Sequence, residues 1–194
     1  MQSSTQPFLL QRVLLYQAIA NNRIFEKQIV SAFKLIQKTI DSGGKILIFG
    51  NGGSAAQAQH FAAELVCKFE KDRQAIPAIA LTTDSSILTA QSNDDGFETV
   101  FSRQIRALCS SSDLIIGLTT SDANITGHSL NIHDAFIAVK NLGAKSIGLF
   151  SQKTKNLLPL VNAPIVVPAD NTALVQEVHQ TVIHLLCCLM EEDL

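Results

Sequence analysis

The residues with the clearest chemical potential lie in a short stretch near the first third of the chain. The Gly50–Ser54 segment (GNGGS) follows an apolar run, and an alanine-rich segment then carries His60 and Glu64. Glycines let a backbone approach an anion closely, and the free N–H groups at the start of a helix attract one. A helix places His60 and Glu64 on one face, with Cβ atoms about 5–6 Å apart. The stretch therefore predicts an anion site followed by a base and a possible metal ligand.

The glycine pattern alone leaves other interpretations open. A plain turn after a buried strand also uses glycines, and the dinucleotide fingerprint tolerates an alanine where Ala55 stands. That fingerprint also needs an acidic residue at the end of a second strand, and none is evident. No Gly-Lys-Ser/Thr follows the glycines and no His-Glu-x-x-His is present, so a P-loop and a metalloprotease are excluded.

A second polar pattern lies in the segment from Thr172 to Glu191. This segment is apolar nearly all round, which predicts a buried helix. Gln176, Gln180 and His184 nevertheless recur along it every four residues. Buried polar groups need partners, and a hydrogen bond to a neighbour would explain any single one. A stripe of three favours a ligand site.

A third polar group, Thr119-Thr120-Ser121, follows another apolar run. Its hydroxyl and N–H groups suit a phosphate, although an ordinary Ser/Thr cap of the next helix is the alternative. Two anion-suited loops that follow buried strands favour a phosphorylated ligand.

The elements that must position these residues alternate between strands and helices. This alternation predicts an α/β fold, a three-layer αβα sandwich with a doubly wound, five-stranded parallel sheet. Ligands of such sheets sit beyond the carboxyl ends of the strands. The predicted strands are 46–49, 77–81, 113–118, 145–150 and 163–167; the predicted helices are 55–65, one from 87 that breaks at 93–96, 97–108, 129–142 and 172–191.

Residues 1–42 are predicted to form a helical extension of a single domain that covers 1–194. Helices are expected at 6–21 and 24–40, and Phe25, Ile29, Phe33, Ile36 and Ile40 form a narrow apolar seam on the second. Such a seam packs either on the sheet or against a helix of another subunit, and the pattern leaves both open.

The composition is that of an ordinary globular protein. The chain has 194 residues, 46% hydrophobic and 16% charged, with a formal net charge of -2. This balance argues against disorder and against nucleic acid as a partner. The four cysteines lack zinc-finger spacing, which favours free, buried thiols in a reducing compartment. No secretory signal and no apolar run of 18 residues is evident, so we expect a cytoplasmic protein with no membrane partner.

Taken together, the motifs resemble the SIS (sugar isomerase) domain family from about Gly44 to the C-terminus. The glycine loop alone would indicate only the superfamily, and the remaining motifs make the resemblance specific. They are His60-Phe61-Ala62 with Glu64, Pro77-Ala78-Ile79-Ala80, Asn93-Asp94 before Gly96-Phe97, Phe101-Ser102-Arg103, Thr119-Thr120-Ser121, Gln176-Glu177 and His184.

The resemblance implies an aldose–ketose isomerase of the branch that converts sedoheptulose 7-phosphate to D-glycero-D-manno-heptose 7-phosphate, a step toward lipopolysaccharide. It implies Glu64 as the base at carbon, His184 as its proton-transfer partner, and a homotetramer with sites at subunit interfaces. It also implies one zinc ion per subunit on His60, Glu64, Gln176 and His184. The substrate-binding residues it implies are Asn51, Gly52, Gly53, Ser54, Glu64, Asn93, Asp94, Thr119, Thr120, Ser121, Ser129 and Gln176.

The sequence departs from the family pattern after Ser121. Asp122 replaces a glycine, and an insertion of about five residues, 123–127, precedes Ser129. A carboxylate beside a phosphate is repulsive unless it points away or meets a cation. Two alternatives to an enzyme are a non-catalytic member that binds the bacterial replication initiator and a sugar-phosphate sensor. The initiator-binding branch is expected to lack an acid and a histidine matching Glu64 and His184, so their presence favours an enzyme.

Overall fold

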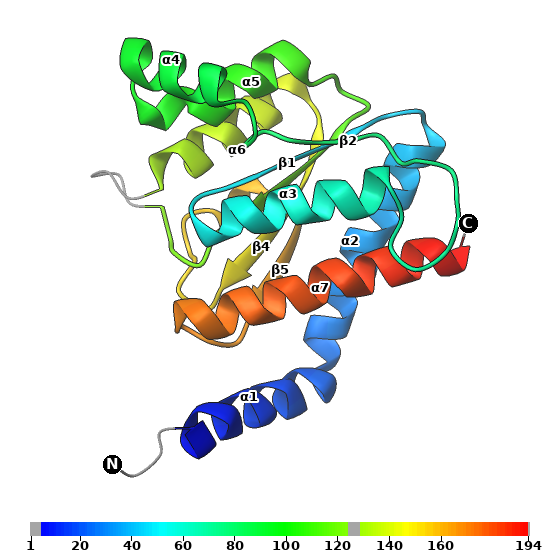
Figure 1. Cartoon of the computed structure of the whole chain (residues 1–194). Coiled ribbons are helices and arrows are strands. Elements are labelled where there is room, and N and C mark those ends of the chain that lie inside the picture. Colours follow the sequence, from blue (N-terminus) through cyan, green and yellow to red (C-terminus); the bar gives the residue numbers. More distant parts are fainter. Residues whose placement is uncertain (1–4, 124–128, 194) are drawn as a thin grey trace.

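The computed structural model describes residues 5–123 and 129–193 and has at its centre a five-stranded, all-parallel sheet. The strand order is β2-β1-β3-β4-β5, with helices on both faces (Figure 1). The predicted α/β sandwich is therefore confirmed. The strands are β1 (Ile46–Gly50), β2 (Ala78–Ala80), β3 (Leu114–Leu118), β4 (Lys145–Ser151) and β5 (Ala163–Val167).

The helices lie close to their predicted positions, and two short 3₁₀ turns occur, one between α4 and α5 and one between β4 and β5. They are α1 (Thr5–Ala20), α2 (Arg23–Asp41), α3 (Gly53–Val66), α4 (Ser85–Asp95), α5 (Val100–Leu108), α6 (Leu130–Leu142) and α7 (Thr172–Asp193), with 3₁₀ turns η1 (Phe97–Thr99) and η2 (Leu158–Leu160).

β1 shows how the sheet divides the core into two layers. Ile46 and Ile48 pack with the apolar faces of α2, α3 and α7, whereas Leu47 and Phe49 pack with α5 and α6. Every residue of β1 is buried, as expected for a parallel strand covered on both faces. The continuous apolar run in the sequence follows from this double burial.

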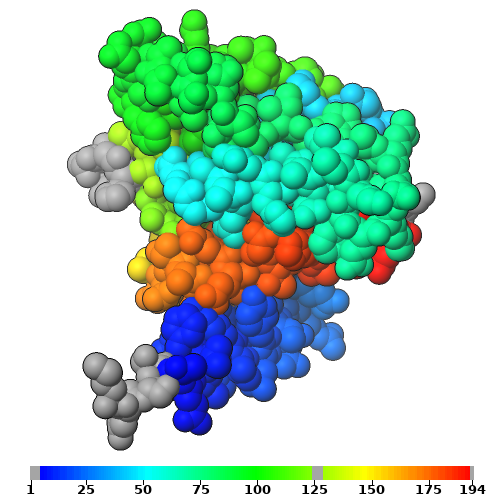
Figure 2. Space-filling view, in the orientation of Figure 1, coloured from blue at the N-terminus to red at the C-terminus, as the bar shows by residue number. Residues whose placement is uncertain are grey.

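The apolar seam of α2 covers the sheet of its own chain. Phe25, Ile29 and Ile36 are buried, and Val166 of β5 donates its N–H to the Gln28 side chain at 3.0 Å. Three of the five seam residues therefore pack within their own chain, and contact of α2 with another subunit stays a prediction. The exposed apolar face lies instead on α1, which has no buried residue and projects beyond α7 (Figure 2).

α4 is longer than the sequence predicts. The Asp84 side chain accepts the N–H of Ile87 at 2.9 Å and caps the helix. The predicted break at 93–96 is confirmed at its last residue, because the helix continues to Asp95 and ends at Gly96. The φ of Gly96 is +91°, a conformation that favours glycine and stops the helix.

α7 is apolar because its inner face packs on the sheet. Among the described residues it is the one helix long and apolar enough to cross a membrane, and 44% of the apolar stretch that meets this test is buried within the domain.

The four cysteines are free, as predicted. Only Cys187 is buried, however, and Cys67 is exposed, so the expectation of buried thiols holds for one of them.

Asp113 ties the start of β3 to the start of β1. Its carboxylate accepts the N–H of Lys45 at 2.9 Å and of Ser110 at 2.7 Å, and lies 2.6 Å from the Lys45 Nζ. Burial alone would raise the pKa of the Asp113 carboxyl, but the Lys45 ammonium and the N–H donors hold it below its ordinary value. The buried carboxylate is therefore stabilised in its charged form.

We predict that Asp113→Asn lowers the free energy of unfolding at pH 7 by about 1–3 kcal/mol in urea titrations, because buried donors lose their acceptor. The lowered pKa means that the wild-type advantage is present above the ordinary value of 3.8 and is lost as the pH falls through the lower folded value. Asp72→Asn, which removes an exposed pair with Lys68, is the control and should leave stability unchanged. Equal losses in both variants would contradict the prediction.

Candidate active site

A cavity of about 650 Å³ opens where the carboxyl ends of β1 and β3 meet. β1 pairs with β2 on one side and β3 on the other, so the connections diverge here. Such switch points are where open α/β sheets bind ligands. The φ of Gly52 is +55°, and a Cβ on Gly53 would lie 2.5 Å from the Gln176 amide nitrogen. The backbone turn and the close packing of Gln176 thus account for these two glycines.

The cavity lies at the starts of three helices, α3, α6 and α7. The first N–H groups of a helix have no partner within it, and this end of the helix dipole is positive. No lysine or arginine lines the cavity in the described part of the chain. An anion would therefore be held by N–H and hydroxyl groups. Of the predicted substrate-binding residues, the cavity is lined by Asn51, Gly52, Ser54, Thr119, Thr120, Ser121, Ser129 and Gln176.

The loop after β3 is held so that Asp122 points away from the cavity. The Asp122 carboxylate accepts the N–H groups of Ala123 at 3.0 Å and Asn156 at 3.0 and 3.1 Å. The Thr119 hydroxyl is bonded within the loop, to the N–H and the carbonyl of Ser121 at 3.1 Å. The carboxylate that replaces the family's glycine therefore faces the next loop. Most of the inserted segment, 124–127, lies outside the described residues.

Asn131 is a cavity residue that the sequence interpretation missed. Its side-chain amide exchanges two hydrogen bonds with that of Asn51, at 2.7 and 2.9 Å, and is 2% exposed. The pair joins the start of α6 to the glycine loop. Ser129 beside it has a φ of +56°, a strained conformation for a residue other than glycine that is common at functional sites.

His60, Glu64 and His184 form one cluster, although His184 lies 120 residues or more after the other two in the chain. His60 Nε2 lies 3.0 Å from His184 Nε2 and 3.3 Å from Glu64 Oε1. One ligand atom from each residue falls within 4.8 Å of the others. The acid on α3 and the imidazole on α7 therefore share one site.

The cluster fits a metal ion. Two ligands bound at about 2.0–2.1 Å to a tetrahedral Zn²⁺ lie about 3.3 Å apart. The observed separations from His60 Nε2, 3.0 and 3.3 Å, match that spacing. Imidazole nitrogen and carboxylate oxygen are also donors that zinc accepts readily.

The polar stripe on α7 joins the cavity to the cluster. Gln176 borders the cavity, and the Gln180 amide lies 2.9 Å from His184 Nε2. Gln57 on α3, which the sequence interpretation missed, is buried and donates to the Gln176 carbonyl at 2.7 Å, while its own Oε1 has no partner. Gln180 is thus the amide in direct contact with the cluster.

Three polar residues do not lie at the cavity or the cluster of this chain. Asn93 and Asp94 bond to each other at 2.9 Å on the exposed end of α4. His179 is fully buried, 3.4 Å from the Phe150 carbonyl, and burial lowers its pKa to about 4. His179 is therefore neutral near pH 7 and belongs to the core.

Comparisons with known proteins identify the family. Residues 14–151 match the SIS domain, so the chain belongs to the SIS domain family. It is 47% identical to the phosphoheptose isomerase of Geotalea daltonii over 86% of this chain and 84% of that protein. The structure of a phosphoheptose isomerase from Francisella tularensis matches with a TM-score of 0.89 and 33% identity, over 97% of this chain and 96% of that one. A HobA–DnaA complex from Helicobacter pylori matches at 11% identity with a TM-score of 0.53, over 98% of this chain and 91% of that one, which shows the fold alone.

We predict that His60→Ala weakens Zn²⁺ binding by at least about 100-fold, because one of three converging donors is lost. Competition with a chromophoric chelator measures the affinity. His133→Ala is the matched control, since His133 is a partly exposed histidine on α6 beside Asp134, outside the cluster. Unchanged affinity in His60→Ala, or an equal loss in the control, would refute the metal site.

Proposed function

We propose that this chain is a phosphoheptose isomerase that interconverts sedoheptulose 7-phosphate and D-glycero-D-manno-heptose 7-phosphate. The observation that carries the proposal is the meeting of Glu64 and His184 in one cluster, beside a cavity suited to an anion. Relatives that share nearly half of the residues are named for this activity. A sugar-phosphate isomerase needs both a phosphate cradle and an acid–base pair, and the cavity and the cluster support these two roles.

The spacing between cavity and cluster suits a long sugar phosphate. His60 lies seven residues after Gly53, so it is about 10 Å further along α3 at a rise of 1.5 Å per residue. We infer that the phosphate binds at the helix starts and that the sugar extends between α3 and α7 toward the cluster. Such a reach is comparable to an extended seven-carbon chain and favours it over a short sugar.

The reaction moves a proton between adjacent carbons through an enediol. In our proposal the Glu64 carboxylate removes the proton from carbon, and His184 donates or relays a proton at the neighbouring oxygen. The N–H groups and hydroxyls of the cavity hold the phosphate, so the reacting carbons stay between these two groups. His60 lies within 3.3 Å of Glu64 and helps to fix the carboxylate.

We propose that the bound metal is zinc. His60, Glu64 and His184 would hold it, and Gln176 stays a prediction as the fourth ligand. A zinc ion there would polarise the carbonyl and stabilise negative charge on oxygen. Gln176 lies two turns before His184, about 12 Å along α7, and it borders the cavity.

The two alternatives receive less support. A non-catalytic partner of the replication initiator needs neither the acid nor the imidazole, and a sensor needs the cavity but not the base. Both groups are present, and their ligand atoms lie within 4.8 Å of each other in the cluster. The named relatives at high coverage are isomerases, which favours the enzyme.

We further propose that residues 1–194 act as one SIS domain within a homotetramer, with 1–42 as a helical extension. Large side chains on α1 are half exposed, an unusual concentration of apolar surface that a subunit contact would cover. The α1 residues are Phe8, Leu9, Leu10, Val13 and Leu14, each 50–56% exposed. Asn93 and Asp94 would then serve a neighbouring subunit's site.

The family resemblance supports a place in lipopolysaccharide precursor synthesis in the cytoplasm.

Glu64→Gln tests the proposed function. We predict that turnover of sedoheptulose 7-phosphate falls by about 10²–10⁴-fold while the fold and sugar-phosphate affinity are kept, because the base is lost and the cavity is not. Chromatographic detection of the aldose product measures turnover. Glu26→Gln, on the exposed side of α2, should behave as wild type. Near-wild-type turnover in Glu64→Gln would refute the assignment.

The α1 surface gives a separate prediction. The double variant Leu10→Glu with Leu14→Glu carries two charges on one face of α1. We expect the wild type to be a tetramer and the double variant to be dissociated, because assembly would bury these charges in the subunit contact. Light scattering after size-exclusion chromatography measures the mass. Leu108→Glu, at an exposed position ending α5, is the control. A monomeric wild type, or a double variant that stays tetrameric, would contradict the proposal.

A further inference from the structure

Glu191 near the end of α7 organises the loop that follows α3. Its carboxylate accepts three consecutive backbone N–H groups, from Phe69 at 2.9 Å, Glu70 at 2.9 Å and Lys71 at 2.8 Å. The side chain of Glu191 is 2% exposed. Three successive N–H groups that converge on one anion form a concave nest, and here the anion is a side chain of the protein itself.

The charge on Glu191 is favoured despite its burial. Burial alone would raise the pKa of the Glu191 carboxyl, but the N–H groups of Glu70, Lys71 and Phe69 and the nearby Arg73 lower it. The carboxylate is therefore ionised at neutral pH. An ionised acceptor makes stronger hydrogen bonds than a neutral one, so the loop is held firmly.

Arg73 connects this carboxylate to the helix that carries Glu64. Its guanidinium donates to the main-chain carbonyls of Glu64 at 2.6 Å and Leu65 at 2.9 Å, which belong to the last turn of α3. Its Nε lies 3.4 Å from Glu191 Oε1, an ionic contact and not a hydrogen bond. Arg73 therefore fixes the end of α3 relative to the end of α7.

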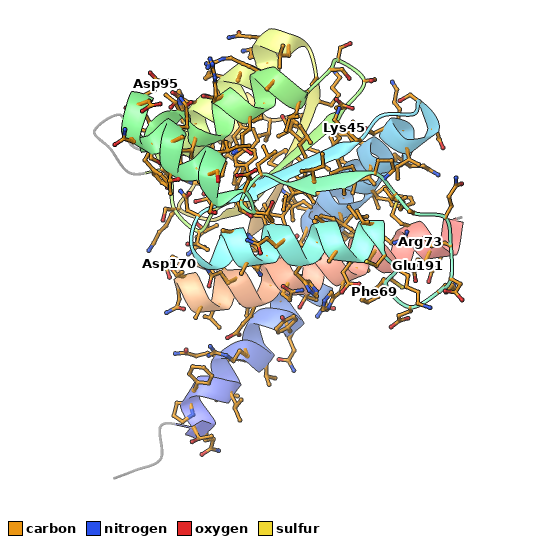
Figure 3. All side chains as sticks on the ribbon, turned by 45° about the horizontal axis from the view of Figure 1, so that its top comes forward. Lys45, Phe69, Arg73, Asp95, Asp170 and Glu191 are labelled. Carbon is orange, nitrogen blue, oxygen red and sulfur yellow. The ribbon has the colours of Figure 1, made fainter. Side chains whose placement is uncertain are left out.

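The loop places an aromatic ring on the imidazole of the cluster. Phe69, whose N–H is bound by Glu191, stacks on His184 with ring centroids 5.3 Å apart and an interplanar angle of 29°. Figure 3 shows Phe69, Arg73 and Glu191 gathered where the end of α7 meets this loop. Glu191 itself lies two turns beyond His184 on the same helix.

We propose that Glu191 is a positioning residue of the active site, which holds Phe69 against the His184 ring and, through Arg73, holds the helix end that carries Glu64. Glu191 does not touch the cluster and acts only through these neighbours. The inference rests on the proposed isomerase function, because one of its readouts is turnover. Glu191, Arg73 and Phe69 would thus hold Glu64 and His184 in place, although they lie away from the cavity.

The first test compares Glu191→Gln with Glu192→Gln, a neighbouring glutamate that is exposed and lies outside the nest. The glutamine side chain replaces one acceptor oxygen of Glu191 with an NH₂ group. This group cannot accept the N–H groups of the loop, so we expect the nest to open. We expect kcat to fall about 10–100-fold, the usual effect of losing a partner that orients a ligand. KM should stay within about twofold, because the phosphate cavity lies at the other end of the helices. Glu192→Gln should match wild type.

A double-mutant cycle separates positioning from general destabilisation. Phe69→Leu should lower kcat by itself, and Glu191→Gln should add little in that background, because both act through the same contact. Fully additive losses would overturn the proposal. If Glu191→Gln does not fold, Phe69→Leu is the test variant. Turnover at the wild-type rate in Phe69→Leu would also overturn the proposal.

Two readouts do not depend on turnover. Amide hydrogen exchange at Phe69, Glu70 and Lys71 should be faster in Glu191→Gln than in Glu192→Gln, and Zn²⁺ affinity should fall about tenfold. Faster exchange with unchanged kcat and unchanged Zn²⁺ affinity would show a purely structural loop and overturn the proposal. An inactive wild type would end the proposed function, while exchange and Zn²⁺ affinity would still decide whether Glu191 supports the cluster.

Discussion

The parallel packing of α3 against α7 is the constraint on which the site depends. Both helices begin at the carboxyl edge of the sheet and run side by side (Figure 1), so residues 124 positions apart in the chain come into contact. Their starts form part of the anion cavity, and their later turns carry His60, Glu64 and His184. In the proposed isomerase, one helix pair would therefore position both the phosphate end and the acid–base end of the ligand.

Features that depend on local pattern could be predicted from the sequence. The strand cores, the glycine loop and the order of elements follow from short apolar runs bounded by glycine. Such runs are typical of parallel strands that are buried on both faces. The pairing of His60 with Glu64 follows from helical periodicity. The meeting of both with His184 was implied by the family resemblance, since no local pattern reveals which two helices pack together.

The rest required the structure because it involves contacts between distant segments. Asn131 and Gln57 each sit in unremarkable helical sequence, and only the position of their partners gives them a role. Glu191 is one of two adjacent glutamates, and nothing in the sequence distinguishes it from Glu192. The run of Asn and Asp before Gly96 indicated the break after α4, and the positive φ available to Gly96 places that break at the end of the run.

The cavity lining has a consequence for how a ligand leaves. Because the described part of the chain places no lysine or arginine there, release of a phosphate ester requires no ion pair of this chain to be broken. Neutral donors are also screened little by dissolved salt, in contrast to full charges. Recognition by this chain would then rest on matching the arrangement of the ligand's oxygen acceptors and not on an ion pair.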